Sequence, residues 1–396
     1  MEHRLVQAIE EAFGWSGAEA VGTGFARGHL DDELASRLLT PNRLLDIVMR
    51  RSLERPQCRI VGKGEEVHPG VYYTQNVSSV GQGISLVDMR AVQTLLSEGA
   101  TLILDQVNAF DPILEVACRA LQWWSHERVE VNAYLTTNDA EGFPLHWDEH
   151  DVLVVQLAGE KKWEVRGPSY PKPMYRDAEP DAVPSEDVIW TGRLKAGDVM
   201  HIPRGHWHRA SRTGSGSGTS LHATFGITRR TGVNWLTWLA NWSHSYETFR
   251  HDLDRTGADF GALEDAAARL MKEQPPAKFL EAHAQEALPP RHVPFLEIFG
   301  ALESVVCISQ FRPQIQDNGD TVEVVAAGKR LLFAVEALPS LRLLLSGRPV
   351  HLEQVQSLVG AEVGEVASIL VEEGLCAMLT PELAAGCAGL VPDASS

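Results

Sequence analysis

His146 and Asp148, separated by one residue, and His208 further along the chain are the residue types of a metal site. Successive side chains of an extended strand point to opposite faces, so a strand through His146 and Asp148 would present both on one face. A histidine from a distant strand would complete a set of two imidazoles and one carboxylate. This set suits non-haem Fe(II), because it leaves positions opposite the ligands open for a cosubstrate and dioxygen.

A lysine follows on the next predicted strand. Lys161, Trp163 and Val165 alternate onto one face of this strand, while Lys162 and Glu164 share the other. The face that carries Trp163 and Val165 is apolar and should look into the fold. Lys161 would then be a buried ammonium that needs an anionic partner to offset its desolvation. Lys162, on the polar face, fits a lysine that reaches into solvent.

Asn132 and Tyr134 alternate onto one face of the strand that precedes His146. Both side chains can donate hydrogen bonds to a carboxylate or carbonyl oxygen. Asparagine and tyrosine on a strand are also common packing residues, so the pattern alone leaves both interpretations open. His222 and Thr224, on the last predicted strand, are weaker candidates for lining the same site as Asn132 and Tyr134.

Hydrophobic periodicity predicts the elements that position these residues. Residues 1 to about 60 have a helical rhythm, Thr101–Asp105 resembles a buried strand, and 111–127 predicts a helix. From Val129 to Gly226, short strands alternate with turn residues, which is typical of two facing antiparallel sheets in a double-stranded β-helix. The Gly/Ser-rich run Thr213–Thr219 is predicted to join the last two strands as a hairpin.

The order and spacing of these motifs resemble the JmjC/cupin oxygenases of the ribosomal-oxygenase type. The turn Pro203-Arg204-Gly205, shortly before His208, belongs to the same pattern. The matching segments are Asn132–Thr136, Gly142–Asp148, Asp151–Trp163 and Gly197–Gly205.

The resemblance implies an Fe(II)- and 2-oxoglutarate-dependent hydroxylase that uses dioxygen. Its substrate would be a protein or peptide side chain, with arginine or histidine of a ribosomal protein as the family precedent. Two alternatives stay open. One is a hydroxylase of an amino acid or precursor peptide in natural-product biosynthesis, and the other is a non-catalytic cupin or winged-helix regulator.

The resemblance also assigns roles to the candidate residues. His146, Asp148 and His208 would be the iron ligands, with no catalytic residue beyond them. Lys161 would hold the far carboxylate of 2-oxoglutarate, and Asn132 and Tyr134 would line the cosubstrate pocket. His206 is the rival of His208, but the family places its ligand at the end of the turn, which favours His208. His201 is expected to be a strand residue whose ring packs on the barrel.

The chain is expected to become helical again from Asn234 to Leu288. Trp235, Trp238, Leu239 and Trp242 recur at helical spacing, which is typical of a core face but could also form a dimer face. The resemblance favours the dimer, because ribosomal oxygenases follow their barrel with a helical dimerisation segment. The run Pro289–Pro294 predicts a domain boundary.

The C-terminal pattern predicts two short helices, 351–359 and 362–373, followed by a strand, 374–379. A helix-turn-helix followed by a β-hairpin is the winged-helix arrangement. The second helix carries carboxylates and no lysine or arginine, which argues against DNA reading. We therefore expect an α+β chain with a JmjC/cupin oxygenase domain at 1–230, a helical dimerisation segment at 231–290 and a winged-helix-like domain at 291–396.

Composition restricts the partners and the compartment. The 396 residues carry a net charge of −18, which favours basic partners over nucleic acid. A basic protein or peptide substrate fits this balance, although solubility alone would explain it as well. We expect no membrane span and no signal peptide, because no apolar stretch is long enough. The five cysteines are odd in number and not closely paired, which indicates free thiols in a reducing cytoplasm.

Overall fold

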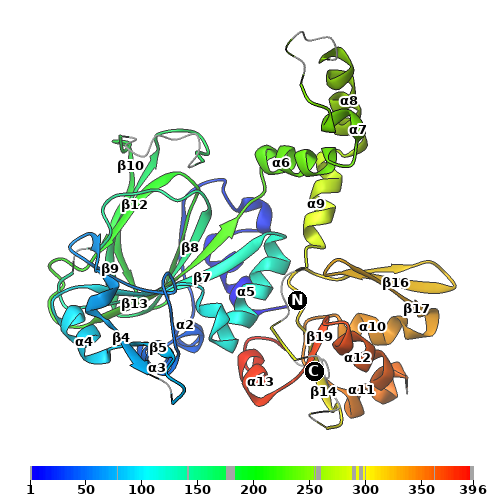
Figure 1. Ribbon diagram of the computed structural model, residues 1–396. Helices are drawn as coiled ribbons and strands as arrows, with labels where there is room; N and C mark the ends of the chain where they lie inside the picture. Colours follow the sequence, from blue (N-terminus) through cyan, green and yellow to red (C-terminus); the bar gives the residue numbers. More distant parts are fainter. Residues whose placement is uncertain are drawn as a thin grey trace.

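The computed structural model describes residues 2–77, 79–140, 142–174, 183–253, 255, 260–287, 291–293, 298, 300–360 and 362–392. They form a barrel with helices on its outside, a helical segment that stands away from it, and a C-terminal unit beside it (Figure 1). Among these residues, every helix is too short or too polar to span a bilayer.

The larger sheet of the barrel has the strand order β1-β11-β8-β13-β7-β6-β2-β3, with antiparallel neighbours throughout. Its central strand, β13, pairs with β7 on one side and β8 on the other. The strands are β1 (Ala26–His29), β2 (Cys58–Gly62), β3 (Glu65–Glu66), β6 (Thr101–Leu104), β7 (Arg128–Thr137), β8 (Asp151–Ala158), β11 (Asp198–Ile202) and β13 (Thr219–Thr228).

The smaller sheet has the order β10-β9-β12 and faces the larger one. It contains β9 (Glu160–Pro168), β10 (Val188–Lys195) and β12 (His206–Ser211). Two facing antiparallel sheets are the double-stranded β-helix that the strand pattern predicts. The hairpin prediction for Thr213–Thr219 was wrong, because this run crosses from β12 in the smaller sheet to β13 in the larger. The side chains between the sheets are Val152, Val154, Trp163, Val165, Leu194, Met200 and Ile202.

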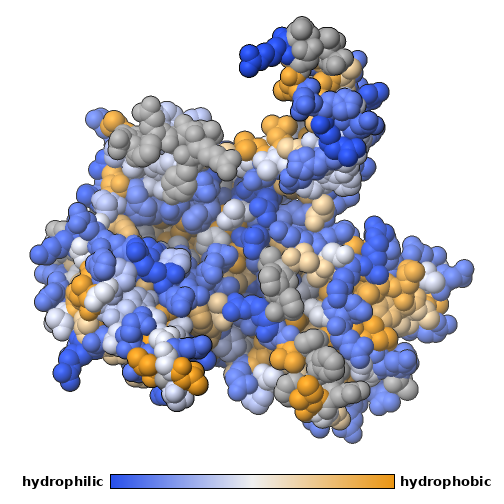
Figure 2. All heavy atoms as spheres, in the orientation of Figure 1, coloured by the Kyte–Doolittle hydropathy of each residue, from blue (hydrophilic) through white to orange (hydrophobic). Residues whose placement is uncertain are grey.

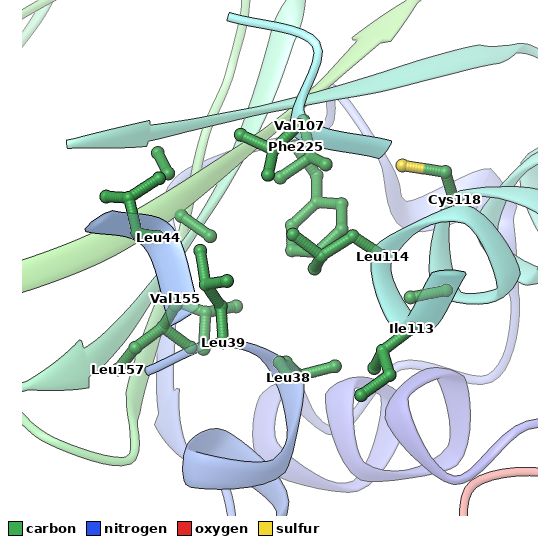
Figure 3. Packing of buried hydrophobic residues seen from close by; sticks show 14 of the residues in the cluster. Leu38, Leu39, Leu44, Val107, Ile113, Leu114, Cys118, Val155, Leu157 and Phe225 are labelled. Atoms are coloured by element: carbon green, nitrogen blue, oxygen red, sulfur yellow. The ribbon is translucent and has the colours of Figure 1, made fainter. Parts of the chain in front are cut away.

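Strand β8 is buried on both faces, which explains its nearly continuous apolar sequence. Val152 and Val154 point into the barrel, whereas the alternating Leu153, Val155 and Leu157 face the helices on the outside. Figure 3 shows Val155 and Leu157 beside Leu38, Leu39 and Leu44, with Phe225 of β13 against Leu114 of the neighbouring helix.

The outer layer consists mainly of helices whose starts are capped by side chains. Asp31 accepts a hydrogen bond from the Glu33 amide, and Asp111 accepts from the amides of Ile113 and Leu114. The helices are α1 (Arg4–Phe13), α2 (Asp32–Leu38), α3 (Pro41–Arg50), α4 (Met89–Ser97) and α5 (Pro112–Ser125), with a separate hairpin of β4 (Tyr73–Val77) and β5 (Gly83–Val87).

The helical segment after the barrel comprises α6 (Gly232–Ser243), α7 (Glu247–Arg250), α8 (Phe260–Glu273) and α9 (Pro276–Ala284). Helices α7 and α8 stand away from both the barrel and the C-terminal unit (Figure 1). Most of the tryptophan stripe contacts other residues of this segment. The Trp235 indole donates to the Gln274 carbonyl over 2.9 Å, and Trp238 packs against Phe279 with ring centroids 5.7 Å apart. Trp242 remains 41% exposed.

The C-terminal unit has its own core and a sheet of order β18-β14-β19. The two predicted short helices are present as α11 and α12, but the strand after them, β19, pairs with the earlier β14 and is followed by α13. The elements are β14 (Ser304–Cys307), β15 (Gln314–Asp317), β16 (Thr321–Ala326), β17 (Lys329–Ala334), α10 (Leu338–Leu344), β18 (Val350–His351), α11 (Leu352–Val359), α12 (Val363–Glu372), β19 (Cys376–Met378) and α13 (Pro381–Cys387).

This unit is tied to the barrel through α5. The Trp123 indole donates to the Ser309 carbonyl over 2.9 Å, and the Gln122 amide contacts Gln310. Val306 and Cys387 join the hydrophobic core of the barrel. Pro289, Pro290 and Pro294 of the predicted boundary lie outside the described residues.

Candidate active site

His146, Asp148 and His208 line one cavity of about 520 Å³ inside the barrel. One potential ligand atom from each lies within 4.8 Å of the others. Nε2 of His208 is 3.5 Å from a carboxylate oxygen of Asp148, and the rings of His146 and His208 have centroids 4.4 Å apart. Two imidazoles and one carboxylate at this spacing can hold a divalent transition metal and leave further coordination positions open.

The loop between β7 and β8, rather than a regular strand, carries His146 and Asp148, which corrects the expectation from the sequence. A bridge to β12 holds the loop: the His146 backbone N–H donates to the His208 carbonyl over 3.1 Å, and the His208 N–H donates back over 2.7 Å. Gly142 lets the loop approach β12, since a Cβ there would lie 1.7 Å from the Ala210 carbonyl oxygen. Pro144, which has no amide hydrogen, prevents a longer ladder.

Both histidines are oriented by backbone carbonyls. Nδ1 of His146 lies 2.9 Å from the Pro144 carbonyl, and Nδ1 of His208 lies 3.1 Å from the His206 carbonyl. A carbonyl only accepts, so these nitrogens carry the hydrogens and the lone pair remains on Nε2. Such contacts fix the tautomer and ring orientation that a metal ligand needs.

The charge states of His146 and Asp148 also suit a cation. Burial and the neighbouring His208 lower the pKa of His146, so its imidazole is neutral and free to coordinate. Burial disfavours the ionised form of Asp148, but the adjacent imidazole of His208 and the nearby His150 and His146 outweigh it and keep the pKa of this carboxyl below its usual range. A neutral imidazole beside an ionised carboxylate is the donor state that metal binding requires.

Lys161 lies in the same cavity and is only 3% exposed. Its ammonium donates to the Thr136 hydroxyl over 3.2 Å and has no carboxylate partner among the described residues. Burial, with a smaller contribution from Arg212, lowers the pKa of Lys161 to about 7. Lys162, on the opposite face of β9, is exposed. A buried cation of this kind is prepared for an anionic ligand that enters the cavity.

Asn132 and Tyr134 both line the cavity. Oδ1 of Asn132 accepts a hydrogen bond from the Gln106 backbone N–H over 2.9 Å, which leaves the Asn132 NH₂ group to donate elsewhere. Tyr134 stacks on His222, with ring centroids 4.7 Å apart and planes 3° from parallel. Burial raises the pKa of Tyr134, so its phenol stays a hydrogen-bond donor. His222 and Thr224 line the same cavity, and burial next to Lys161 keeps the pKa of His222 well below its usual value.

The two histidines nearest the Pro203–Gly205 turn that were weighed against His208 lie outside the metal-binding group. His206 is not part of the metal-binding group and does not line the cavity, whereas His208 does both. His201 is fully buried, packs edge-on against Trp15 and has its Nδ1 2.8 Å from the Gly24 carbonyl.

Thr136, His150 and Arg212 are among the cavity or near-cavity residues that the sequence reasoning missed. Thr136 follows Asn132 and Tyr134 on the same face of β7, so strand alternation could have found it. His150 lines the cavity two residues after Asp148, where a Cβ on Gly226 would approach its ring to 2.8 Å. Arg212, directly after β12, helps to lower the pKa of Lys161 through its positive charge, and no signal in the sequence connects the two residues.

The comparisons with known proteins agree with this arrangement. Residues 108–235 match the JmjC domain. The chain is 32% identical over 128 residues to ribosomal oxygenase 2 of Rattus norvegicus, covering 32% of this chain and 26% of that protein. It is 34% identical over 129 residues to the bifunctional lysine-specific demethylase and histidyl-hydroxylase NO66 of Drosophila simulans, covering 30% and 14%. The chain thus spans about a quarter or less of these relatives' length.

Solved structures extend the likeness to the rest of the chain. The structure of E. coli ycfD superposes with a TM-score of 0.55 at 17% identity, covering 95% of this chain and 99% of that one. A structure of the ribosomal oxygenase YcfD from Escherichia coli in complex with cobalt and 2-oxoglutarate gives a TM-score of 0.51 at 18% identity, covering 86% and 90%. At this identity the likeness establishes the fold.

Proposed function

We propose that this chain, a JmjC protein of the ribosomal-oxygenase type, is an Fe(II)- and 2-oxoglutarate-dependent hydroxylase that acts on a protein or peptide side chain. One observation carries the proposal: a potential metal triad and a buried lysine without a carboxylate partner line the same cavity. A cation site and an anion site in one pocket match a metal and a carboxylate cosubstrate. Burial of the Lys161 ammonium costs free energy, and in a non-catalytic regulator no bound anion would offset that cost.

His146, Asp148 and His208 would hold the iron, and Lys161 would bind the far carboxylate of 2-oxoglutarate. When bound, the metal and cosubstrate supply the oxidative chemistry, in which dioxygen and 2-oxoglutarate yield succinate, carbon dioxide and one oxygen atom for a substrate C–H bond.

The protein's own part is orientation and the exclusion of water. Thr136 positions the Lys161 ammonium, while Asn132 and Tyr134 can donate hydrogen bonds to the cosubstrate. Trp163, 5% exposed, and Val154, fully buried, form apolar wall at the same cavity. In such a dry environment, the charge-assisted contact of Lys161 with a carboxylate is stronger than it would be in water.

The substrate we propose is an arginine or histidine side chain of a protein. The names of the relatives support a protein substrate, since they include a ribosomal oxygenase and a histidyl-hydroxylase. We also propose a cytoplasmic location, which the five free and buried cysteines support.

The regions outside the barrel have proposed roles as well. The segment 231–290 would form a homodimer through its exposed apolar side chains, which include Val233, Leu236, Trp242 and Leu280. The unit at 291–396 would be a winged-helix-like domain in which β14 supplies the central strand, and it would contact protein rather than nucleic acid.

Mass spectrometry of a treated lysate tests the activity. The purified chain is incubated with Fe(II), 2-oxoglutarate and a cell lysate, and tryptic peptides are searched for the gain of one oxygen atom. We expect modified peptides with the wild type and none with Asp148→Ala. Oxygen gained only by free amino acids would favour the biosynthetic alternative, and loss of methyl groups from peptides would indicate demethylation. If no succinate is formed, the proposed 2-oxoglutarate-dependent activity is refuted.

A further inference from the structure

A second cavity of about 270 Å³ lies next to the catalytic one, and Arg230 lines both. Its wall is basic. The charged side chains in it are Lys172, Arg204, Arg229, Arg230 and Asp151. Four cations and one carboxylate around a small cavity are unusual in a chain whose net charge is −18.

Three of these cations are not neutralised by an ion pair. Within the described part of the chain, the Arg229 guanidinium donates only to the Val21 carbonyl, over 2.8 Å, and that of Arg204 only to the Lys172 carbonyl, over 3.3 Å. Lys172 is exposed and likewise forms no ion pair there. Other barrel arginines differ, since Arg209 lies 2.6 Å from the carboxylate of Glu164.

The one carboxylate of the cavity is already engaged. Asp151 is 3% exposed, accepts the Arg204 backbone N–H over 3.1 Å and lies 3.6 Å from Nε2 of His201, and the charge of Arg229 helps to keep its pKa below the usual range without forming an ion pair with it. Arg230 is compensated from the other side, because Glu286 of the segment after α9 lies 3.4 Å from its guanidinium. The cavity therefore keeps an excess of positive charge, and contacts with backbone carbonyls hold the guanidinium groups of Arg204 and Arg229 in place.

The basic cavity is joined to the metal triad by one turn. Within the turn between β11 and β12, the Gly205 amide donates to the Asp148 carbonyl over 3.0 Å, and the adjacent Arg204 amide donates to Asp151. Arg204 is thus one residue from a backbone contact with a proposed metal ligand. The basic cavity and the metal triad are therefore neighbours in the fold, linked by this turn and by Arg230.

We propose that this basic cavity binds an anionic group of the substrate, a carboxylate or a phosphate that lies next to the residue to be hydroxylated. The inference rests on the proposed function and sharpens it, because it selects an acidic or phosphorylated segment despite the overall negative charge of the enzyme. Arginine pairs bidentately with both groups, and the cavity offers two guanidinium groups without carboxylate partners.

Inorganic sulfate tests the site without turnover. The full chain is loaded with Mn(II) and saturating 2-oxoglutarate, so that the anion position at Lys161 is occupied, and sulfate is titrated against chloride at matched ionic strength. We expect sulfate to raise the melting temperature of the wild type. The apparent Kd should rise roughly tenfold to a hundredfold in Arg204→Gln/Arg229→Gln, which loses two charge-assisted contacts.

The matched control is Arg51→Gln/Arg90→Gln, which removes two exposed arginines that line neither cavity. It should bind sulfate like the wild type. Lys161→Ala lacks the anion position at Lys161, so without 2-oxoglutarate it should bind sulfate like the wild type that is saturated with 2-oxoglutarate. Circular dichroism verifies the fold of each variant, and Arg229→Lys, which keeps the charge, should retain most of the binding. Equal responses of the two double variants would overturn the site even where hydroxylation is intact.

Peptides identified by the lysate experiment form the second arm. We expect Asp, Glu or a phosphorylated residue beside the hydroxylated position. Its replacement by the amide or unphosphorylated form should raise KM roughly tenfold for the wild type but hardly for Arg204→Gln/Arg229→Gln. Carboxylate and phosphopeptides, compared at the same position, identify the source of the anion. Hydroxylated residues flanked only by basic residues would contradict the proposal.

Discussion

The barrel cavity and the helical segment after the barrel place their side chains in opposite ways. The cavity buries polar groups, including a lysine that is 3% exposed and a histidine, His208, that is 6% exposed. The helical segment instead exposes apolar groups, with Leu236 at 52% and Leu280 at 51%. Figure 2 shows apolar patches on this segment amid polar surface. Each arrangement costs free energy in the isolated chain.

This difference indicates what each region binds. Buried charge is offset by small ions and polar ligands, so the cavity fits a metal and a dicarboxylate. Exposed apolar side chains are offset by another protein surface, which is the basis of the proposed contact with a second copy of the chain.

Removing a proposed metal ligand should have the largest effect. We expect His146→Ala, Asp148→Ala or His208→Ala to abolish 2-oxoglutarate turnover, because two remaining ligands hold the metal poorly. The fold should persist, since the loop and β12 are packed independently of the metal. His206→Ala is the matched control and should retain turnover. Inactivation by His206→Ala with an active His208→Ala would show that the wrong histidine was chosen.

Lys161→Ala should follow in size. Loss of the charge-assisted contact would leave a carboxylate of 2-oxoglutarate unpaired in a buried site, at a cost of roughly 2–5 kcal/mol in binding free energy. Calorimetric titration of 2-oxoglutarate into the Mn(II)-loaded protein measures it. Lys162→Ala, on the exposed face of the same strand, should bind like the wild type. Similar losses at both positions would contradict the role of Lys161.

The helical segment gives a smaller effect per residue. Burial of one large apolar side chain at an interface contributes about 1.5–3 kcal/mol, so Leu236→Glu combined with Leu280→Glu should convert a dimer to a monomer. Light scattering at several concentrations provides the mass. Leu332→Glu, at an exposed position of β17 that is 70% exposed, is the control and should leave the mass unchanged. A wild type that is monomeric at high micromolar concentration would refute the dimer.

The pH dependence of 2-oxoglutarate binding should be the mildest effect. Below the Lys161 pKa of about 7, the side chain is already charged and binds a carboxylate fully. Above it, binding must first take up a proton, so affinity should fall by up to about tenfold for each pH unit. Calorimetry in buffers of different ionisation enthalpy measures the uptake. Lys161→Arg, which stays charged, should remove the dependence between pH 7 and 9, roughly the range above the pKa. A flat wild-type profile would argue against this coupling.

The two regions also differ in how far the sequence alone could describe them. Alternation along β9 placed Lys161 with Trp163 and Val165, because the pleat of a strand has a strict period of two. The same rule applied to β7 placed Asn132 and Tyr134 on one face, and it would have included Thr136. In the helical segment, periodicity identified the tryptophan stripe but could not tell that Trp235 and Trp238 pack within the segment.

What the sequence determined by itself was local: residue types at the metal triad, the side-chain alternation of the strands, and the start of the helix that Asp111 caps. Strand partners were decided only by the tertiary structure, because β12 and β13 are consecutive yet pair in different sheets. The same holds for the loop that carries His146 and Asp148, which is set in place by a bridge to His208 and by the close approach that Gly142 permits. The basic cavity likewise arises only when Lys172, Arg204 and Arg229 meet, since long-range contacts leave no period in the sequence.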